Sequence, residues 1–411
     1  MTDTLKPRDA KDVEAAVQGA VAGGQTLELV GQGTKRAIGR AAQWDLTLDL
    51  SALSGVTLYE PEELVLSARA GTPLAEIEAL VAARGQELAF EPMDYGPVLG
   101  EPAGRGTLGG ALAANLAGPR RIKAGAARDH FLGFSAVSGR GETFKSGGRV
   151  VKNVTGYDLC KLIAGSWGTL AAMTDVTVKV LPRAETELTV FLRGLDDAAA
   201  VQALNLAMGS AGEVSAAAHL PADTVRRSAL TFFATGEAVT ALRLEGIAPS
   251  IAHRRAILQT VLKAFGDADM LAEPASRALW RAVRDVLPFA ADTGSPDRQR
   301  PLWRISTTPM QGPAVARRIA ERAAASFIYD WAGGLIWAEL GLSDDASAAL
   351  VREAVAASGG HATLIRAPAA IRAAVAVFDP QEQGVAMLSR RIKESFDPRG
   401  VLNPGRMWAG V

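Results

Sequence analysis

Apolar residues first recur at helical spacing along the chain and then fall into short alternating segments. Val13, Val17 and Val21 lie on one face of a predicted helix. Asp9 is placed to cap the start of this helix, and Gly23-Gly24 ends it. Alternation or short apolar runs between turn residues then predict strands at residues 27–30, 46–50, 64–70 and 174–181.

Further elements are predicted from capping residues and composition. Residues 71–73 indicate a helix start, with Thr72 as N-cap and Pro73 in the first helical position. Residues 103–118 are largely glycine and alanine, and a short helix is predicted over 111–116. Beyond Pro182 the chain is rich in alanine, which we interpret as a second α+β domain. Its predicted strands include residues 187–192, 229–234 and 335–340.

Composition narrows the class of protein. Hydrophobic residues make up 48% and charged residues 21% of the 411 positions, as in a globular protein with a filled core. Forty-four basic residues balance 44 acidic ones, so no net field favours nucleic acid or a membrane surface. Neither a membrane span nor a signal peptide is evident. We therefore expect a cytoplasmic protein without direct membrane insertion, whose membrane contact, if any, comes through partners.

The chain contains one cysteine, Cys160. One thiol excludes an internal disulfide, a zinc site of the usual type and an iron–sulfur cluster held by this chain alone. Because Cys160 lies in an apolar run, we expect a small buried residue. A reactive thiol is the alternative.

Three glycine-rich segments can bring backbone N–H groups close to phosphate oxygens, because glycine has no Cβ. The first follows a predicted strand and consists of Gly31, Gln32, Gly33, Thr34 and Lys35. Thr34 offers a hydroxyl hydrogen bond, and Lys35 offers positive charge near a pyrophosphate. A plain hairpin turn is the alternative.

The second segment satisfies the G-x-G-x-x-G spacing through Gly104, Gly106 and Gly109. No strand precedes it and no later acidic ribose ligand is evident, so a Rossmann site is disfavoured. A glycine turn that leads into a helix still suits an anion at the helix N-terminus. The third segment covers residues 152–159 and 165–170, where Gly165 and Gly168 either approach a ligand or only pack the domain.

The order of these segments resembles the FAD domain of the vanillyl-alcohol-oxidase family, the PCMH-type fold. The resemblance is carried by residues 31–35, 107–110 with Asn115, Gly125 with Arg128-Asp129, and 156–159 with 168–170. The tail at 397–405 is similar to that of the flavin-dependent 2-hydroxyacid dehydrogenases. Closer resemblance to the FAD-binding subunits of bacterial glycolate oxidase lies in residues 89–94, 118–121, 147–153 and 359–364.

The resemblance implies a division of the chain into three parts with an α+β fold. A PCMH-type FAD-binding domain of two α+β subdomains would cover residues 1–183, and a second α+β cap domain would cover 184–365. Residues 366–411 would return to the FAD domain. The residues implied to bind FAD are Gly31, Gln32, Gly33, Thr34, Lys35, Thr107, Leu108, Gly109, Gly110, Asn115, Asp129, Gly165, Gly168 and Asn403. Gln32 stands where covalent members often have a histidine, so FAD is expected without a covalent link.

A metal site is not expected, because the histidines are few and scattered. The histidine-rich motif of the catalytic glycolate oxidase subunit is missing. The four histidines are His130, His219, His253 and His361.

The candidates for catalysis are His361, Tyr157 and Arg366. His361 follows two glycines, but a structural histidine is the alternative. Arg366 can meet an anionic substrate, although a surface or interdomain salt bridge is favoured. Trp331 and Trp337 can flank a flavin, although core packing is favoured for both.

By resemblance, the chain is expected to be an FAD-binding subunit of a glycolate oxidase complex. Glycolate, a small 2-hydroxy acid, would be oxidised to glyoxylate. The chain would pass the electrons from this oxidation through its flavin to an iron–sulfur subunit. A catalytic flavoprotein subunit would be the other partner. Two alternatives stay open: a self-sufficient FAD-dependent hydroxyacid or alcohol dehydrogenase, and a structural FAD-binding subunit without turnover.

Overall fold

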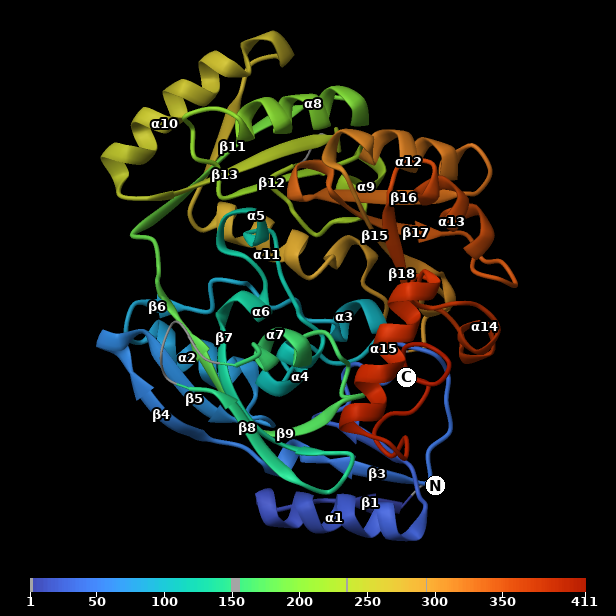
Figure 1. The fold of residues 1–411 in the computed structure, drawn as a ribbon. Helices are drawn as coiled ribbons and strands as arrows, with labels where there is room; N and C mark the ends of the chain where they lie inside the picture. Colours follow the sequence, from blue (N-terminus) through green and yellow to red (C-terminus); the bar gives the residue numbers. More distant parts are fainter. Residues whose placement is uncertain (1–2, 149–155, 234–235, 293) are drawn as a thin grey trace.

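The computed structural model describes residues 3–148, 156–233, 236–292 and 294–411. The stretch 152–155 of the third glycine-rich segment and Ala234 of a predicted strand lie outside the described residues. The structure has two lobes, which we call the N-terminal lobe (residues 3–182) and the sheet lobe (residues 186–366). Figure 1 shows them stacked on each other.

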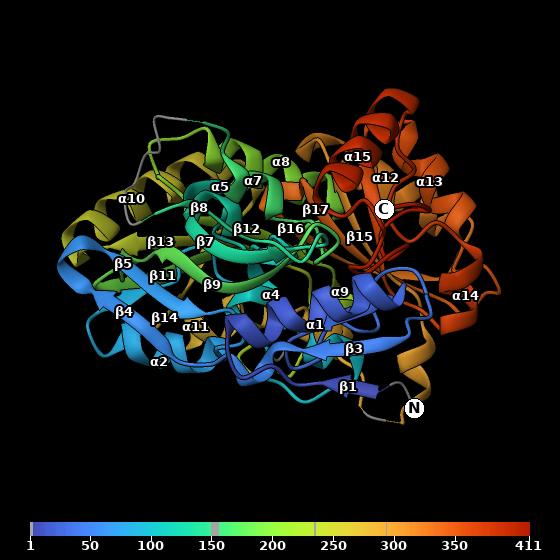
Figure 2. The ribbon, with the colours of Figure 1, turned by 60° about the horizontal axis from the view of Figure 1, so that its bottom comes forward.

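The N-terminal lobe opens as the sequence predicts. Helix α1 (Ala10–Gly23) begins where the Asp9 side chain accepts hydrogen bonds from two backbone N–H groups, and it ends at Gly24, which is left-handed. Its buried residues Val13 and Val17 face the parallel sheet β1-β3-β2. Figure 2 shows α1 beside this sheet. The strands of the sheet are β1 (Asp3–Leu5), β2 (Leu27–Val30) and β3 (Leu46–Asp49).

A second sheet completes the core of the N-terminal lobe. It is antiparallel with the order β4-β5-β9-β7-β8, and the pair β10-β6 lies beside it. Its strands are β4 (Val56–Glu60), β5 (Val65–Arg69), β7 (Phe131–Ser138), β8 (Thr143–Gly147) and β9 (Ala171–Lys179), with β6 (Gln86–Glu87) and β10 (Leu181–Pro182). The helices are α2 (Leu74–Ala82), α3 (Gly96–Leu99), α4 (Leu108–Ala113), α5 (Arg121–Ala124), α6 (Ala127–His130) and α7 (Leu159–Ile163).

The sheet lobe is built on one antiparallel sheet with the order β14-β11-β13-β12-β16-β17-β15-β18. Its strands are β11 (Thr186–Arg193), β12 (Ala216–Leu220), β13 (Val239–Gly246), β14 (Asp269–Ala272), β15 (Leu302–Thr307), β16 (Ala325–Asp330), β17 (Leu335–Leu340) and β18 (Gly360–Arg366). Its helices are α8 (Asp197–Met208), α9 (Ala222–Arg227), α10 (Ala248–Val261), α11 (Ala275–Arg284), α12 (Gly312–Ala320) and α13 (Ala348–Ala356). Helices α8, α10, α12 and α13 cover the face that points away from the N-terminal lobe, while α9 and α11 pack on part of the face that points towards it (Figure 1).

Three local predictions were wrong. The Thr72 hydroxyl donates to the Arg69 carbonyl and does not cap, so α2 begins at Leu74 after Pro73. Helix α4 starts at Leu108, earlier than predicted, because the Thr107 side chain caps it. Residues 229–233 form no strand, since the chain turns there to pack Phe233 against Phe191.

The C-terminal segment returns to the N-terminal lobe after α14 (Ala369–Ala374) and α15 (Gln383–Phe396). The Lys393 ammonium donates to the Asp397 carboxylate at 2.6 Å and to the carbonyls of Thr169 and Leu402. Leu402 then forms a parallel bridge with Leu27 of β2. The end of the chain thereby completes the sheet that begins near residue 3.

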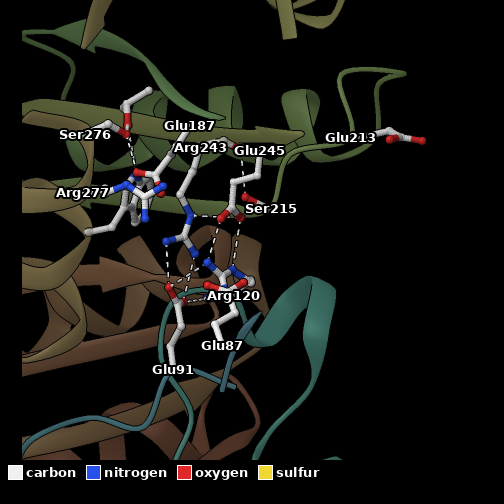
Figure 3. Close-up of polar contacts among 12 residues, drawn as sticks. Glu87, Glu91, Arg120, Glu187, Glu213, Ser215, Arg243, Glu245, Ser276 and Arg277 are labelled. Atoms are coloured by element: carbon white, nitrogen blue, oxygen red, sulfur yellow. Dashed lines mark hydrogen bonds and ion pairs between the residues drawn. The ribbon is translucent and has the colours of Figure 1, made fainter. Parts of the chain in front are cut away.

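A buried ion-pair network joins the two lobes (Figure 3). Arg243 of β13 is 2% exposed and donates two hydrogen bonds, of 2.8 and 2.9 Å, to the Glu91 carboxylate of the N-terminal lobe. Arg120, also from the N-terminal lobe, donates to Glu87 at 2.7 Å and to Glu245 of β13 at 2.7 Å. Since buried arginines need their carboxylates, the network fixes how the lobes face each other.

The lobes also share one hydrophobic core. Phe90 and Val98 of the N-terminal lobe belong to the same buried cluster as Phe289, Trp337 and Ile365 of the sheet lobe. Cys160 is 3% exposed in this cluster, as predicted for a small buried residue, and burial raises the pKa of its thiol to about 12. No helix among the described residues combines the length and hydropathy needed to cross a bilayer.

Candidate functional site

A pocket of about 740 Å³ opens between the two sheets of the N-terminal lobe. The first two glycine-rich segments meet in its wall: a Cβ on Gly31 would lie 2.7 Å from the Thr107 hydroxyl oxygen. The pocket is lined by Leu29, Val30, Gly31, Gln32, Gly33, Thr34, Lys35, Arg36, Leu50, Ala70, Gly71, Thr107, Gly109, Gly110, Ala113, Ala114, Trp167, Gly168, Ala171, Ala172, Met173 and Arg406. We call it the nucleotide pocket.

Close backbone packing explains why glycine is required in the second segment. A Cβ on Gly109 would lie 2.8 Å from the Ala70 carbonyl oxygen, closer than real contacts allow. A Cβ on Gly110 would lie 2.9 Å from the Thr107 hydroxyl oxygen and 3.4 Å from the Lys35 Nζ. A larger residue at either position would displace the wall that Lys35 faces.

Replacing Thr107 with alanine should lower the free energy of unfolding by about 1 kcal/mol, because α4 loses its N-cap. The Thr107 hydroxyl oxygen accepts a hydrogen bond from the Gly110 N–H at 3.2 Å. Urea denaturation monitored by circular dichroism measures the change. Thr107→Ser keeps the acceptor and should remain close to the parent protein, and equal losses in both variants would contradict a capping role.

Two cations in the nucleotide pocket lack a carboxylate partner among the described residues. Burial lowers the pKa of Lys35 to about 8 and that of Arg406 to about 10. The Arg406 Nη2 donates to the Lys35 carbonyl at 2.7 Å, while its buried Nε has no hydrogen-bond partner. Desolvated cations of this kind fit an anionic group such as a diphosphate.

The nucleotide pocket meets a larger cavity of about 1330 Å³ at Ala114 and Trp167, which line both. This interdomain cavity lies between the N-terminal lobe, the open face of the large sheet and the C-terminal segment. Its lining is Met93, Tyr95, Ala114, Asn115, Leu116, Ala117, Arg121, Gly165, Trp167, Arg304, Ser306, Trp331, Trp337, His361, Thr363, Ile365, Phe378, Asp379, Pro380, Gln381, Met407 and Trp408.

The large sheet presents its polar groups to the interdomain cavity through the two-residue period of its strands. Arg304 and Ser306 alternate along β15, and His361 pairs with Ser306 from the neighbouring strand β18. Burial lowers the pKa of His361, and the positive charge of Arg304 lowers it further. His361 is therefore neutral near pH 7 and able to accept a proton. Burial raises the pKa of Tyr95 on the opposite wall, so its phenol stays protonated.

Trp331 brings two arginines together in this cavity. The guanidinium carbons of Arg121 and Arg304 lie 4.8 and 5.1 Å from the centroid of the Trp331 ring. The indole N–H donates to the Gly118 carbonyl at 3.0 Å. Trp331 and Ala332 both have left-handed backbones, with φ of 51° and 58°, a conformation that costs free energy in non-glycine residues. The local backbone is thus strained where Trp331 enters the cavity.

The residues expected to follow the cofactor fall into two groups. Gly168 lines the nucleotide pocket, and Asn115 and Gly165 line the interdomain cavity. Asn403, Asp129 and Leu108 line neither: the Asn403 side chain accepts a hydrogen bond from the Leu29 N–H and donates one to the Trp167 carbonyl, Asp129 accepts one from the Ala126 N–H, and Leu108 is buried in the hydrophobic core. Asn403 therefore shapes the wall from behind, and the roles of all these residues in binding stay predictions.

The catalytic candidates lie in three different places. His361 is in the wall of the interdomain cavity. The Tyr157 side chain is 90% exposed and lines neither cavity. Arg366 is 3% exposed, donates to Glu339 at 2.6 Å and also holds the carbonyls of Val98 and Phe289. Arg366 thus forms a buried salt bridge within the sheet lobe and one hydrogen bond to the N-terminal lobe, and not the surface or interdomain salt bridge that the sequence favoured.

Sequence reasoning missed Arg121, Arg304 and Arg406. Arg121 is the last residue of the segment 118–121, and Arg406 directly follows the tail motif at 397–405. Both therefore lie in or next to segments that carry the family resemblance. Arg304 stands in an alternating strand, where a charged residue predicts only a solvent-facing position. Trp331 and Trp337 were considered, and they both line the interdomain cavity and belong to the buried core.

Comparison with known proteins places this architecture in a family. Residues 4–147 match the family model described as FAD binding domain. Glycolate oxidase subunit GlcE of Escherichia coli (strain K12) is 32% identical over 394 residues, which cover 96% of this chain and 95% of that protein. The chain belongs to the family of glycolate oxidase subunit GlcE.

More distant relatives agree with this assignment to the GlcE family. An uncharacterised FAD-linked oxidoreductase of Mycobacterium tuberculosis is 29% identical over 432 residues, covering 97% of this chain and 89% of that protein. The crystal structure of p-cresol methylhydroxylase with substrate bound superposes with a TM-score of 0.72 at 13% identity, covering 99% and 88% of the two chains, and this likeness shows the fold alone. The predicted α+β PCMH-type fold and the predicted FAD are confirmed, and this GlcE-family member is an FAD-dependent oxidoreductase.

Proposed function

We propose that this chain is the FAD-binding subunit of a glycolate oxidase complex that oxidises glycolate to glyoxylate and passes the electrons to an iron–sulfur subunit. The observation that carries the proposal is the junction of the nucleotide pocket with a cavity that contains a neutral histidine and two arginines that form no ion pair among the described residues. A cofactor with a diphosphate against Lys35 and Arg406 would extend past Trp167 into that cavity. The relationship to GlcE supports glycolate as the substrate.

The chain's own residues supply the other requirements of the reaction. Oxidation of a CH–OH group removes the hydroxyl proton and two electrons with the hydrogen on carbon, and bound FAD is the acceptor of those electrons. The His361 imidazole is the group in the cavity wall that accepts the hydroxyl proton. Trp331, Trp337 and Phe378 line the same cavity and give its wall apolar surface.

The electrons must then leave for a partner. One cysteine cannot hold an iron–sulfur cluster, so an iron–sulfur acceptor would belong to another subunit. We place a catalytic flavoprotein subunit and an iron–sulfur subunit in the complex. The self-sufficient dehydrogenase stays the second candidate, because the interdomain cavity holds its own proton acceptor and cations.

The test begins with the purified chain and its visible spectrum. We expect flavin that acid precipitation releases completely, since Gln32 offers no covalent attachment. Glycolate is then added without oxygen, first to the chain alone and then with the partner subunits. Bleaching only with the partners supports the complex, and bleaching of the chain alone supports the self-sufficient enzyme. A flavin that stays oxidised in both experiments would contradict both functions and leave the structural subunit.

A further inference from the structure

Two arginines face the interdomain cavity and form no ion pair with an acidic residue in the described part of the chain, although Asp129 and Asp330 lie near enough to act on their pKa values. Among the residues that the structure describes, neither Arg121 nor Arg304 forms an ion pair or a side-chain hydrogen bond, and burial lowers the pKa of both. Asp379, the acidic residue in the cavity lining, is paired with Arg352. Buried charges are normally paired, so this part of the cavity carries positive charge that suits an anionic ligand.

The two arginines come from opposite walls and converge on one ring. Arg121 belongs to α5 of the N-terminal lobe, and Arg304 belongs to β15 of the sheet lobe. Both guanidinium groups lie over Trp331, whose position is fixed by its hydrogen bond to Gly118 and its left-handed backbone. Stacking on an aromatic ring holds the planar guanidinium groups ready for a ligand without neutralising them.

We infer that Arg304 and Arg121 form the subsite that binds the carboxylate of a small 2-hydroxy acid in this chain's own cavity. The inference deepens the proposed function and rests on it. Guanidinium groups match the two oxygens of a carboxylate with paired hydrogen bonds. A carboxylate held there has its hydroxyl-bearing carbon one bond away, and His361 lies on the neighbouring strand β18, opposite Ser306, two residues along β15 from Arg304.

The rest of the cavity favours a small ligand of this kind. Trp337 lies on the strand beside Arg304, with Tyr95 edge-on at 6.4 Å between ring centroids. These aromatic groups offer apolar contact and one phenolic hydroxyl, which suit a short carbon chain. The positive charge of Arg121 and Arg304 would thus face the carboxylate of the ligand, and the proton acceptor His361 would face its hydroxyl group.

Oxalate is the probe, because it has the carboxylates but no C–H bond to oxidise. Titration of the flavin-loaded protein is followed by isothermal calorimetry and by the flavin absorbance. Arg304→Gln should weaken oxalate binding about 10- to 100-fold, the effect of losing a charge-assisted pair. Arg304→Lys keeps the charge but loses the planar fork, and we expect an intermediate affinity. Arg121→Gln should also weaken binding.

Arg317→Gln is the matched control, because Arg317 is an exposed arginine of α12 and the charge change is the same. Its oxalate affinity should equal that of the parent protein. Flavin content and thermal midpoint are recorded for each variant, so that lost folding is distinguished from lost binding.

Three results would overturn the inference. They are an absence of oxalate binding to the flavin-loaded protein, equal affinity in Arg304→Gln and Arg317→Gln, and inorganic phosphate that competes as well as oxalate. If oxalate binds through Arg304 but glycolate never reduces the flavin, the carboxylate subsite stands and the proposed substrate fails. The two proposals are therefore tested separately.

Discussion

Replacing Glu91 with alanine should destabilise the protein by about 3–5 kcal/mol, because the buried Arg243 loses its hydrogen-bonded carboxylate and keeps only the longer contact to Glu245 at 3.5 Å. Glu91 accepts two hydrogen bonds from Arg243 and a third from the Arg120 N–H at 2.8 Å. Arg243 is 2% exposed, so its guanidinium depends mainly on protein partners. Chemical denaturation measures the change, and the lobes should lose their fixed interface.

An exposed ion pair of the same type is the control. Glu62 lies 3.8 Å from Arg84 with both side chains largely exposed, so Glu62→Ala should cost about 0–1 kcal/mol. Equal losses in the two variants would show that the lobes do not depend on the network.

Low pH should destabilise the protein through the same residue, Glu91. Burial alone would raise the pKa of Glu91, but Arg243 and Arg120 lower it to about 2. The folded state thus binds this proton less readily than the unfolded chain, whose ordinary value is 4.5. The stabilisation is present above pH 4.5 and is lost as the pH falls towards 2. Glu91→Ala should lack this part of the acid dependence.

Replacing Lys35 with methionine should raise the Kd for FAD about 10- to 100-fold, from the loss of a charge-assisted contact of ~1.5–3 kcal/mol. Lys35 faces Gly110 at the start of α4 and has no carboxylate partner among the described residues. Because burial disfavours its charge in the flavin-free protein, the same change should not lower the stability of that form. Fluorescence titration of flavin-free protein gives Kd, and Lys11→Met on exposed α1 is the control.

The pH dependence of FAD binding distinguishes a charged lysine from a merely polar one. Burial lowers the pKa of Lys35 to about 8, so the flavin-free protein carries this charge below pH 8 and loses it above. Affinity should be constant from pH 6.5 to 8 and then fall by up to about tenfold per pH unit. A parent protein with the same profile as Lys35→Met would contradict contact with the diphosphate.

The parts of the fold that depend on neighbouring residues could be predicted from the sequence. Asp9 and Gly24 bound α1 as predicted, and β2 occupies residues 27–30, because caps and short apolar runs act locally. The order of the large sheet could not be predicted, since β12 pairs with β16 and β15 with β18 across long separations. The role of Thr72 could not be predicted either, because its hydroxyl donates to the carbonyls of Gly55 and Arg69, and a capping pattern does not reveal these partners.

The candidate site was also only partly predictable from the sequence. Glycine loops are visible in sequence, and the segments 31–35 and 107–110 do meet in one wall. Arg304 has no such signal, because alternation along β15 does not tell a cavity from solvent. Tyr157 was selected from its motif, yet it is exposed. Charge and exposure at a cavity depend on both lobes, and a single segment does not encode them.

The meeting of both chain ends at the nucleotide pocket orders the events of biosynthesis. Asn403 holds the Leu29 N–H across 374 residues, and Arg406 contacts the Lys35 carbonyl. A nascent chain still on the ribosome lacks both until translation has passed residue 406, although its N-terminal glycine loops were made long before. We therefore expect FAD to bind after translation has finished. A chain truncated just before residue 403 should bind less FAD than the full chain, which the flavin content of the two purified proteins measures.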